Sequence, residues 1–241
     1  MRVVSNERHI KVRHFIGQYS TLGGLVALVA GMIISFAAPE QFTITMACMV
    51  AGVLLSLVGG FFANRYAGPL AHHEALIAVL KGLGQQHTLL NYTLPVPHVL
   101  VEPSGLTAIV VKTHKGRIAY QEKGKWQHHE RGKFFRQLVG QESIGAPDLD
   151  AERQVDKLTS LLAERLPEVD IPTRAVVVFV NPAADLDAGN SPVPAFYGKK
   201  VKAWLRGPGK LKPLPSNVHR QLVEALGIET DTTAQAPETP Q

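Results

Sequence analysis

PHVLVEPSGLTAIVVKTHKGRI, residues 97–118, is the stretch from which the fold of this chain is predicted. Residues 98–101, His-Val-Leu-Val, are mainly apolar and include two β-branched valines, and residues 107–111 form a charge-free run typical of a strand that is buried on both faces. Residues 103–105, Pro-Ser-Gly, favour a tight turn, because proline presets φ and glycine readily takes positive φ. The stretch therefore predicts two strands joined by a turn, with Lys112 where the second strand meets a basic turn.

Helices and further strands are predicted on both sides of this pair. In chain order, the expected elements are a helix over 70–83, strands over 88–92 and 116–121, a helix over 149–166, a strand over 174–180, short edge strands over 193–197 and 199–205, and a helix over 216–226. The helix over 149–166 carries an apolar stripe, and Asp148 or Asp150 is expected as its N-cap. Because a helix between two apolar strands is typical of a crossover connection, the predicted fold is α/β, a mixed sheet flanked by helices.

Two long segments without charged residues precede this domain. Residues 22–38 and 42–63 are apolar or small throughout, and residues 39–41 between them are enough for a tight reversal. About 20 such residues span the core of a bilayer. The alternative is a helical hairpin buried in a soluble core, but a chain of 241 residues is too small to enclose two uncharged helices. We therefore predict a transmembrane helical hairpin.

The charged residues beside these segments predict their orientation. The turn contains only Glu40, whereas the outer flanks carry Arg2, Arg8, Lys11, Arg13 and Arg65. By the positive-inside rule, both ends of the hairpin are expected in the cytoplasm, in a multi-pass protein of the cell membrane. Tyr19 and Tyr66 are expected as aromatic anchors at the membrane surface, and paired glycines are expected to let the two helices pack closely.

These patterns divide the chain into four regions. We expect a basic cytoplasmic arm over 1–21, the hairpin over 22–63, a cytoplasmic domain over 64–227 and a disordered, polar tail over 228–241. The single cysteine, Cys48, excludes an internal disulfide and a cysteine-based zinc site. The histidine pairs 72–73 and 128–129 are expected at the surface, because adjacent side chains point in different directions and no spaced ligand set completes a metal site.

With these elements in place, residues 70–206 resemble the nuclease-related domain (NERD), a branch of the PD-(D/E)XK, restriction-endonuclease-like fold. The resemblance rests mainly on HVLVEPSGLTAIVVKTHKGRI, where the family has Asp-His, an apolar run, Gly-Pro-x-Gly, a second apolar run, Glu-x-Lys and Gly-Arg-Ile. A preceding helix with Glu74 and a following helix with Gln154 also fit. The resemblance implies a Mg²⁺ site in which the Asp and the Glu bind the metal and the lysine contacts water or phosphate.

The sequence departs from the family at both metal-binding positions. Pro97 stands where the family has Asp, and Val110 stands where it has Glu. Lys112 and Glu74 remain as candidate catalytic residues, but one carboxylate and one lysine make a poor metal site. Glu102, at the turn, would supply an acid only if the turn folded unusually. The resemblance therefore implies the fold and argues against hydrolysis, so no cofactor is expected.

Two basic stretches, residues 112–136 and 199–220, are candidate binding surfaces. The residues expected to contact phosphate or lipid headgroups are Lys115, Arg117, Lys123, Lys125, Lys199, Lys200 and Lys202. Three interpretations stay open: a solvated basic face, attraction to anionic lipid headgroups beside a cytoplasmic leaflet, and contact with nucleic acid. The last of these rests on fold analogy.

The predicted function is that of a membrane-anchored protein whose nuclease-related domain is catalytically inactive and acts as a binding or scaffold module. Its expected partners are the lipid bilayer and either anionic headgroups or nucleic acid. The alternative is a membrane-tethered, Mg²⁺-dependent nuclease that hydrolyses phosphodiesters of DNA or RNA. A homo-oligomeric envelope protein, in which the domain mediates self-association, is a third interpretation.

Overall fold

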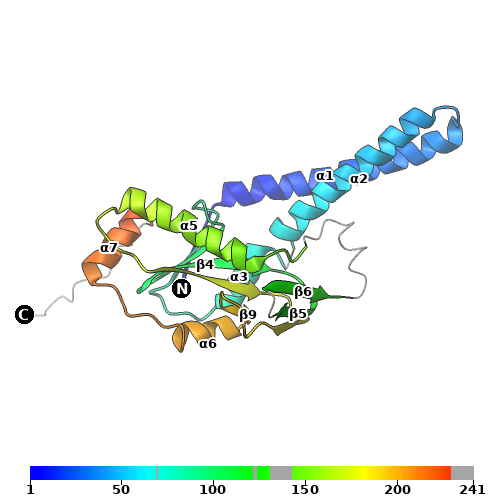
Figure 1. Cartoon of the computed structure of the whole chain (residues 1–241). Helices are drawn as coiled ribbons and strands as arrows, with labels where there is room; N and C mark the ends of the chain where they lie inside the picture. Colours follow the sequence, from blue (N-terminus) through cyan, green and yellow to red (C-terminus); the bar gives the residue numbers. More distant parts are fainter. Residues whose placement is uncertain (69, 122–123, 131–142, 229–241) are drawn as a thin grey trace, which may run out of the picture.

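The computed structural model describes residues 1–68, 70–121, 124–130 and 143–228. A long helical hairpin projects from a layered α/β domain (Figure 1). The predicted fold class, a mixed sheet flanked by helices and preceded by two apolar helices, is confirmed. Residues 229–241, where a disordered tail is predicted, lie outside the described residues.

The main sheet has six strands in the order β1-β2-β3-β4-β7-β9. They are β1 (Arg2–Ser5), β2 (Thr88–Asn91), β3 (His98–Glu102), β4 (Gly105–Lys112), β7 (Thr173–Phe179) and β9 (Ala195–Tyr197). The pairs β2–β3 and β3–β4 are antiparallel, and the other three pairs are parallel. A smaller sheet, β6-β5-β8, is made of β5 (Gly116–Gln121), β6 (Lys125–His129) and β8 (Ala184–Asp187).

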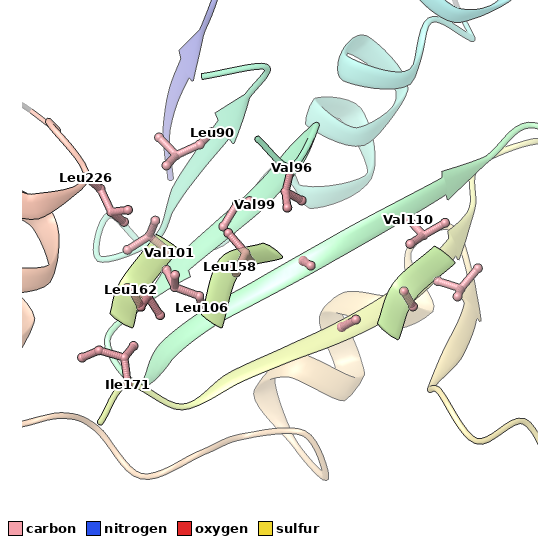
Figure 2. Close-up of a cluster of buried hydrophobic side chains, with 14 of the residues drawn as sticks. Leu90, Val96, Val99, Val101, Leu106, Val110, Leu158, Leu162, Ile171 and Leu226 are labelled. Carbon is pink, nitrogen blue, oxygen red and sulfur yellow. The ribbon is translucent and has the colours of Figure 1, made fainter. Parts of the chain in front are cut away.

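Helices cover both faces of the main sheet. α5 (Pro147–Arg165) and α7 (Ser216–Ala225) pack on one face, and α3 (His72–Leu80) and α6 (Lys200–Arg206) pack on the other. The edge strand expected over 199–205 is wrong, because this segment forms α6, which buries Val201 and Leu205, four residues apart, against the sheet. Along β4, Ala108 and Val110 belong to the cluster on the α5 face, part of which is drawn in Figure 2, while Ile109 and Val111 belong to the α3 cluster. This alternation is why the strand reads as one continuous apolar run in the sequence.

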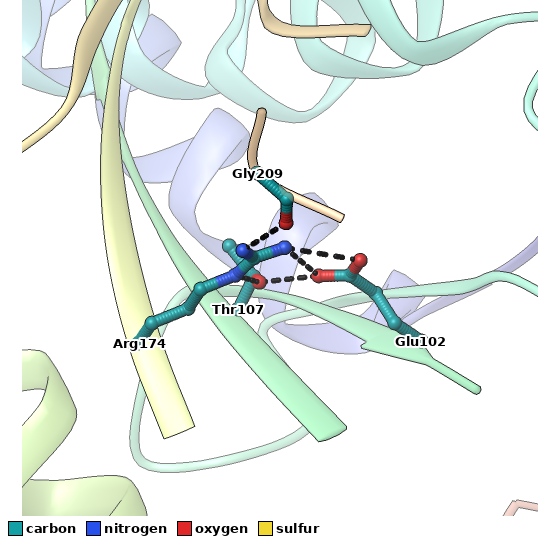
Figure 3. A network of polar contacts seen from close by, with 4 residues as sticks. All are labelled: Glu102, Thr107, Arg174 and Gly209. Atoms are coloured by element: carbon teal, nitrogen blue, oxygen red, sulfur yellow. Dashed lines mark hydrogen bonds and ion pairs between the residues drawn. The ribbon is translucent and has the colours of Figure 1, made fainter. Parts of the chain in front are cut away.

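The turn end of the β3–β4 pair is fixed by a buried ion pair. Arg174 on β7 donates from Nη2 to both carboxylate oxygens of Glu102, at 3.0 and 3.2 Å, and from Nε to Thr107 Oγ1 at 2.9 Å (Figure 3). Its Nη1 donates to the carbonyl of Gly209, and its guanidinium lies 4.5 Å from the ring centroid of Trp204. Glu102 is therefore a structural residue. It pairs with Gly105 at the start of β4, whereas Lys112 lies at the far end of that strand.

The hairpin consists of α1 (Glu7–Ala37) and α2 (Phe42–Tyr66), both long and apolar enough to cross a membrane. α1 begins well before residue 22, so most of the region expected as a separate arm over 1–21 belongs to this helix. The buried residues along the two helices recur every seven positions and are mostly glycines: Ile10, Gly17, Gly24 and Gly31 on α1, and Gly52, Gly59 and Tyr66 on α2. Such a seven-residue repeat brings two helices together along one seam.

The N-terminal strand connects the hairpin to the domain. β1 pairs in parallel with β2, and the backbone N–H of Asn6, which caps α1, donates to the carbonyl of Asn91 at 2.9 Å. The sequence analysis did not predict this strand, because residues 2–5 are too short and too polar to stand out as β-structure. It ties the start of α1 to the domain that follows α2, so both ends of the hairpin lie on the same side.

An aromatic cluster fills the joint between the hairpin and the domain. Tyr66 is 7% exposed, and its ring lies 5.3 Å from that of Tyr92 and 6.0 Å from that of Phe62. His9 stacks on Tyr92 at 5.1 Å. The ring of Tyr66 is therefore buried between the hairpin and the domain, and is not exposed to a surrounding membrane as the predicted anchor would be. Tyr19, by contrast, is 64% exposed on α1.

Candidate functional site

A cavity of about 380 Å³ lies where β3 begins and β4 ends. Val99 pairs with Ala108, so continuing the antiparallel register by two residues places Pro97 opposite Val110, and both line the cavity. The two positions that carry metal ligands in the resembled family therefore meet here, but with apolar side chains. The remaining lining residues are Arg65, His72, Pro95, His98, Ile109, Val111, Lys112, Asp150, Arg153, Gln154 and Lys157.

Positive charge dominates the wall of this cavity. Lys112 continues the alternation of β4 toward α5, and its Nζ lies 3.0 Å from Asp150 Oδ2 in the first turns of that helix. Arg153 and Lys157 follow on the same face of α5, while Arg65 comes from the end of α2. Asp150 is the only carboxylate among the described lining residues, beside the four cations Arg65, Lys112, Arg153 and Lys157.

Two hydrogen-bond acceptors at the cavity have no partner of their own among the described residues. The amide of Asn91 donates to Ser5 Oγ at 3.1 Å, which leaves its Oδ1 to accept from His98 Nδ1 at 2.9 Å. This network assigns the proton of His98 to Nδ1 and leaves Nε2 as a buried, unpaired acceptor. Gln154 Oε1 is likewise buried without a partner. The cavity thus offers acceptors as well as cations.

The two histidines of this cavity are neutral. Burial lowers the pKa of His98 well below its ordinary value, and the neighbouring His72, Arg65 and His73 lower it further. Burial also lowers the pKa of His72 to about 3, with smaller contributions from the positive charges of Arg65 and Lys112. The prediction that His72 is a surface residue is wrong, because it is only 9% exposed at the start of α3.

The free energy of unfolding is expected to fall as the pH decreases below 6.5. The unfolded chain binds a proton at His72 near pH 6.5, and the folded protein binds it only near pH 3, so the unfolded state holds more protons between these values. Each unit of pH in this window costs up to about 1.4 kcal/mol. Between pH 7.5 and pH 5, His72 alone is expected to lower the free energy of unfolding by roughly 2 kcal/mol. His98, whose pKa is also lowered, adds to this loss. Urea unfolding of the whole protein in detergent at the two pH values measures the difference.

A His72→Gln variant is expected to lose the part of this pH dependence that comes from His72, roughly 2 kcal/mol, and to keep the part that comes from His98. His129→Gln, which removes an exposed histidine on β6, is the matched control and is expected to keep the native profile. Equal slopes for the two variants would contradict the assignment to His72.

The residues of this cavity do not fit a Mg²⁺ ion. Magnesium in proteins takes one or two carboxylates together with water and phosphate oxygens. Pro97 and Val110 supply no side-chain oxygen, and the single carboxylate, Asp150, is already engaged by Lys112. Within the described ranges, no group of three or more His, Cys, Asp or Glu side chains is placed to hold a metal.

Of the residues predicted from the sequence to be catalytic or to contact phosphate or lipid headgroups, only Lys112 lines this cavity. Glu74 is exposed on α3. Burial lowers the pKa of the neighbouring His73, and the negative charge of Glu74 offsets only part of that shift. Lys115 pairs with Glu130 at 3.2 Å, and Lys202 donates to the carbonyl of Lys81 at 2.8 Å. The remaining predicted contact residues are exposed on β5, β6 and the start of α6, at Arg117, Lys125, Lys199 and Lys200, while Lys123 lies outside the described residues.

Apart from Gln154, which supports the family resemblance, the contribution of α5 to this cavity was not predicted from the sequence. Asp150, Arg153, Gln154 and Lys157 have the spacing i, i+3, i+4 and i+7, which puts them on one face of the helix. This polar stripe on one face of the helix is the sequence feature from which the contribution of α5 could have been predicted. The predicted N-cap is also wrong: the helix begins at Pro147 after Ala146, and Asp148 instead accepts a hydrogen bond from Trp126 Nε1 at 3.1 Å.

Comparison with known families agrees with this geometry. The family model of the nuclease-related domain matches residues 71–180, which run from the start of α3 to the end of β7 and include every strand of the cavity. Searches of curated proteins and of solved structures gave no match. The resemblance seen in the sequence is thereby confirmed, and the chain carries a nuclease-related domain over residues 71–180, behind two helices that are candidate membrane anchors.

Proposed function

We propose that this protein is a membrane-anchored binding module whose nuclease-related domain holds a phosphate-bearing ligand without hydrolysing it. The observation that carries the proposal is the replacement of both metal ligands by Pro97 and Val110 in a cavity that keeps its cations. A phosphate group gains charge-assisted hydrogen bonds from lysine and arginine without any metal. The domain thereby keeps cations that can bind phosphate and lacks the metal ligands that a nuclease needs to activate water.

The acceptors in the wall favour a ligand that also carries N–H or O–H donors. His98 Nε2 and Gln154 Oε1 are buried and unpaired in the structure as described, and leaving such groups unsatisfied is costly. A volume of about 380 Å³ falls at the lower end of the range for small-molecule sites. A nucleotide, free or at the end of a nucleic acid strand, combines phosphate oxygens with sugar and base donors.

The membrane anchor supports a cytoplasmic location for this site. α1 and α2 expose large apolar side chains along their length, and β1 holds both ends of the hairpin on the side of the domain. The excess of arginine and lysine at that side is the arrangement that the positive-inside rule assigns to the cytoplasm. We accordingly place the cavity at the cytoplasmic face of the cell membrane.

The test uses the whole protein in nanodiscs of phosphatidylcholine and a fluorescent single-stranded oligonucleotide as the probe. The double variant Arg153→Gln/Lys157→Gln is expected to weaken binding at least tenfold, because it removes two of the four cations. Lys199→Gln, which removes one exposed charge from the start of α6, is the control and is expected to bind within twofold of the native protein. Fluorescence anisotropy at several salt concentrations measures both.

The same samples decide between binding and hydrolysis. Incubation with Mg²⁺ or Mn²⁺ is expected to leave the oligonucleotide intact. Cleavage that is lost in Lys112→Ala would establish the alternative, a membrane-tethered nuclease. Absence of binding by the native protein, or equal weakening in Lys199→Gln, would refute the proposal.

A further inference from the structure

A second cavity, of about 360 Å³, lies in the joint between the hairpin and the domain. Its wall includes Arg13 from α1, Arg65 and Phe61 from α2, and the aromatic rings of Tyr66 and Tyr92. We propose that this joint cavity binds the phosphate headgroup of an anionic phospholipid. The inference is independent of the proposed function, because it concerns another cavity and another ligand.

The joint cavity lies at the depth of the headgroups. Residues 14–39 and 41–64 contain no Asp, Glu, Lys or Arg, so Arg13 and Arg65 are the first charges met on leaving the two apolar segments. At 1.5 Å per residue, the 24 residues of 41–64 span about 36 Å, which is a hydrocarbon core of about 30 Å and part of one interface. With the tip of the hairpin at one surface, both arginines reach the other.

Charge and shape match a lipid phosphate. No Asp or Glu is among the described residues that line the joint cavity, and the guanidinium of Arg13 lies 5.7 Å from the centre of the Tyr66 ring. Arginine binds phosphate through two parallel hydrogen bonds and tolerates stacking on aromatic rings. Arg13 comes from α1 and Arg65 from α2, so one phosphate placed between them would be held by both helices.

The apolar side of the joint cavity continues onto the surface of the hairpin. Phe61 is 37% exposed in the wall, and Ile16, one turn further along α1 than Arg13, is 41% exposed. These side chains provide a path for acyl chains that leave a headgroup in the cavity. A soluble anion would use the arginines alone, so the apolar path favours a lipid over free phosphate.

The two cavities can be tested separately. They share Arg65, Pro95 and Pro97, but Arg13 belongs only to the joint cavity and Lys157 only to the first. Arg13→Gln is therefore the informative variant. Its matched control is Lys11→Gln, which removes the same charge from an exposed position two residues earlier on the same helix. Arg13→Lys, which keeps the charge, guards against a folding defect.

The experiment is a titration of the whole protein, in a neutral detergent, with phosphatidylglycerol or phosphatidylcholine, followed by native mass spectrometry. The native protein and Lys11→Gln are expected to retain one phosphatidylglycerol at least fivefold more tightly than phosphatidylcholine. Arg13→Gln is expected to lose this preference, and Arg13→Lys to keep part of it. Oligonucleotide binding is expected to be unchanged in Arg13→Gln, which separates this result from that of the first cavity.

Three outcomes would overturn the proposal. Equal retention of the two lipids by the native protein would show that the cavity does not distinguish an anionic headgroup from a zwitterionic one. Equal losses in Arg13→Gln and Lys11→Gln would show only general attraction to the basic end of the helix. Displacement of phosphatidylglycerol by millimolar inorganic phosphate would identify a soluble anion as the ligand.

Discussion

Mild oxidation of a Gly31→Cys variant is expected to join the two hairpin helices almost completely through a disulfide with Cys48. A Cβ built at Gly31 would lie 3.0 Å from the Cβ of Cys48, and disulfides span about 3.5–4.5 Å between Cβ atoms, so only a small separation of the helices is needed. Cys48 is the single cysteine of the chain, so no competing pair exists. Intact-mass analysis after alkylation of free thiols measures the cross-linked fraction, because cysteines joined in a disulfide are not alkylated.

Ile33→Cys is the matched control for this cross-link. It lies two residues further along α1 and is 58% exposed, on the side of the helix away from α2, so it is expected to remain reduced. Adding Gly52→Leu to Gly31→Cys is expected to lower the yield, because a Cβ at residue 52 would lie 2.6 Å from Cγ of Leu28 and push the helices apart. Equal yields in Gly31→Cys and Ile33→Cys would mean that the helices do not pack along the glycine seam.

Arg174→Ala is expected to destabilise the domain by about 3–5 kcal/mol, since it leaves the carboxylate of Glu102 buried without its charge partner. The side chain of Glu102 is 6% exposed and that of Arg174 is 18% exposed, so water does little to replace the lost interaction. The loss is a large part of a typical stability of 5–15 kcal/mol. Urea unfolding of the whole protein in detergent, followed by tryptophan fluorescence, measures the change.

Two further variants show whether the effect comes from burial of the charge. Arg153→Ala breaks a longer ion pair, 3.8 Å, made by a side chain that is 72% exposed, and is expected to cost under about 0.5 kcal/mol. Glu102→Leu/Arg174→Met removes both charges and is expected to recover much of the stability lost in Arg174→Ala. If Arg174→Ala were as mild as Arg153→Ala, the ion pair would not be a main support of the β3–β4 turn.

The sequence predicted the centre of the fold because its signals there are local. The apolar run of residues 107–111, the Pro-Ser-Gly turn and the stripe on the helix after residue 147 are each readable within one element, and β3, β4 and α5 follow them. Lys112 was placed at the end of its strand for the same reason. The family resemblance added the expectation that positions 97 and 110 meet, which the strand register supports.

What the sequence could not reveal depends on contacts between distant segments. Asp150 looked like a helix cap because its spacing to Lys112, 38 residues, carries no pattern. From the sequence, Arg65 was interpreted as a flanking charge that sets the orientation of a membrane helix, although it also lines two cavities. Tyr66 looked like an interfacial ring because burial by Tyr92 and His9 is decided only when the hairpin and the domain meet.

The pairing of β1 with β2 fixes the order in which this protein can be built. Ser5 and Asn91, which face each other across this pair, are 86 residues apart, and the whole hairpin lies between them. A growing chain therefore completes both candidate membrane helices before the ribosome has made the strand that β1 needs. The sheet can close only afterwards, so a truncated domain that starts after α2 would expose the edge of β2 and invite edge-to-edge aggregation. A soluble version would instead keep residues 1–6 and replace the hairpin with a short linker.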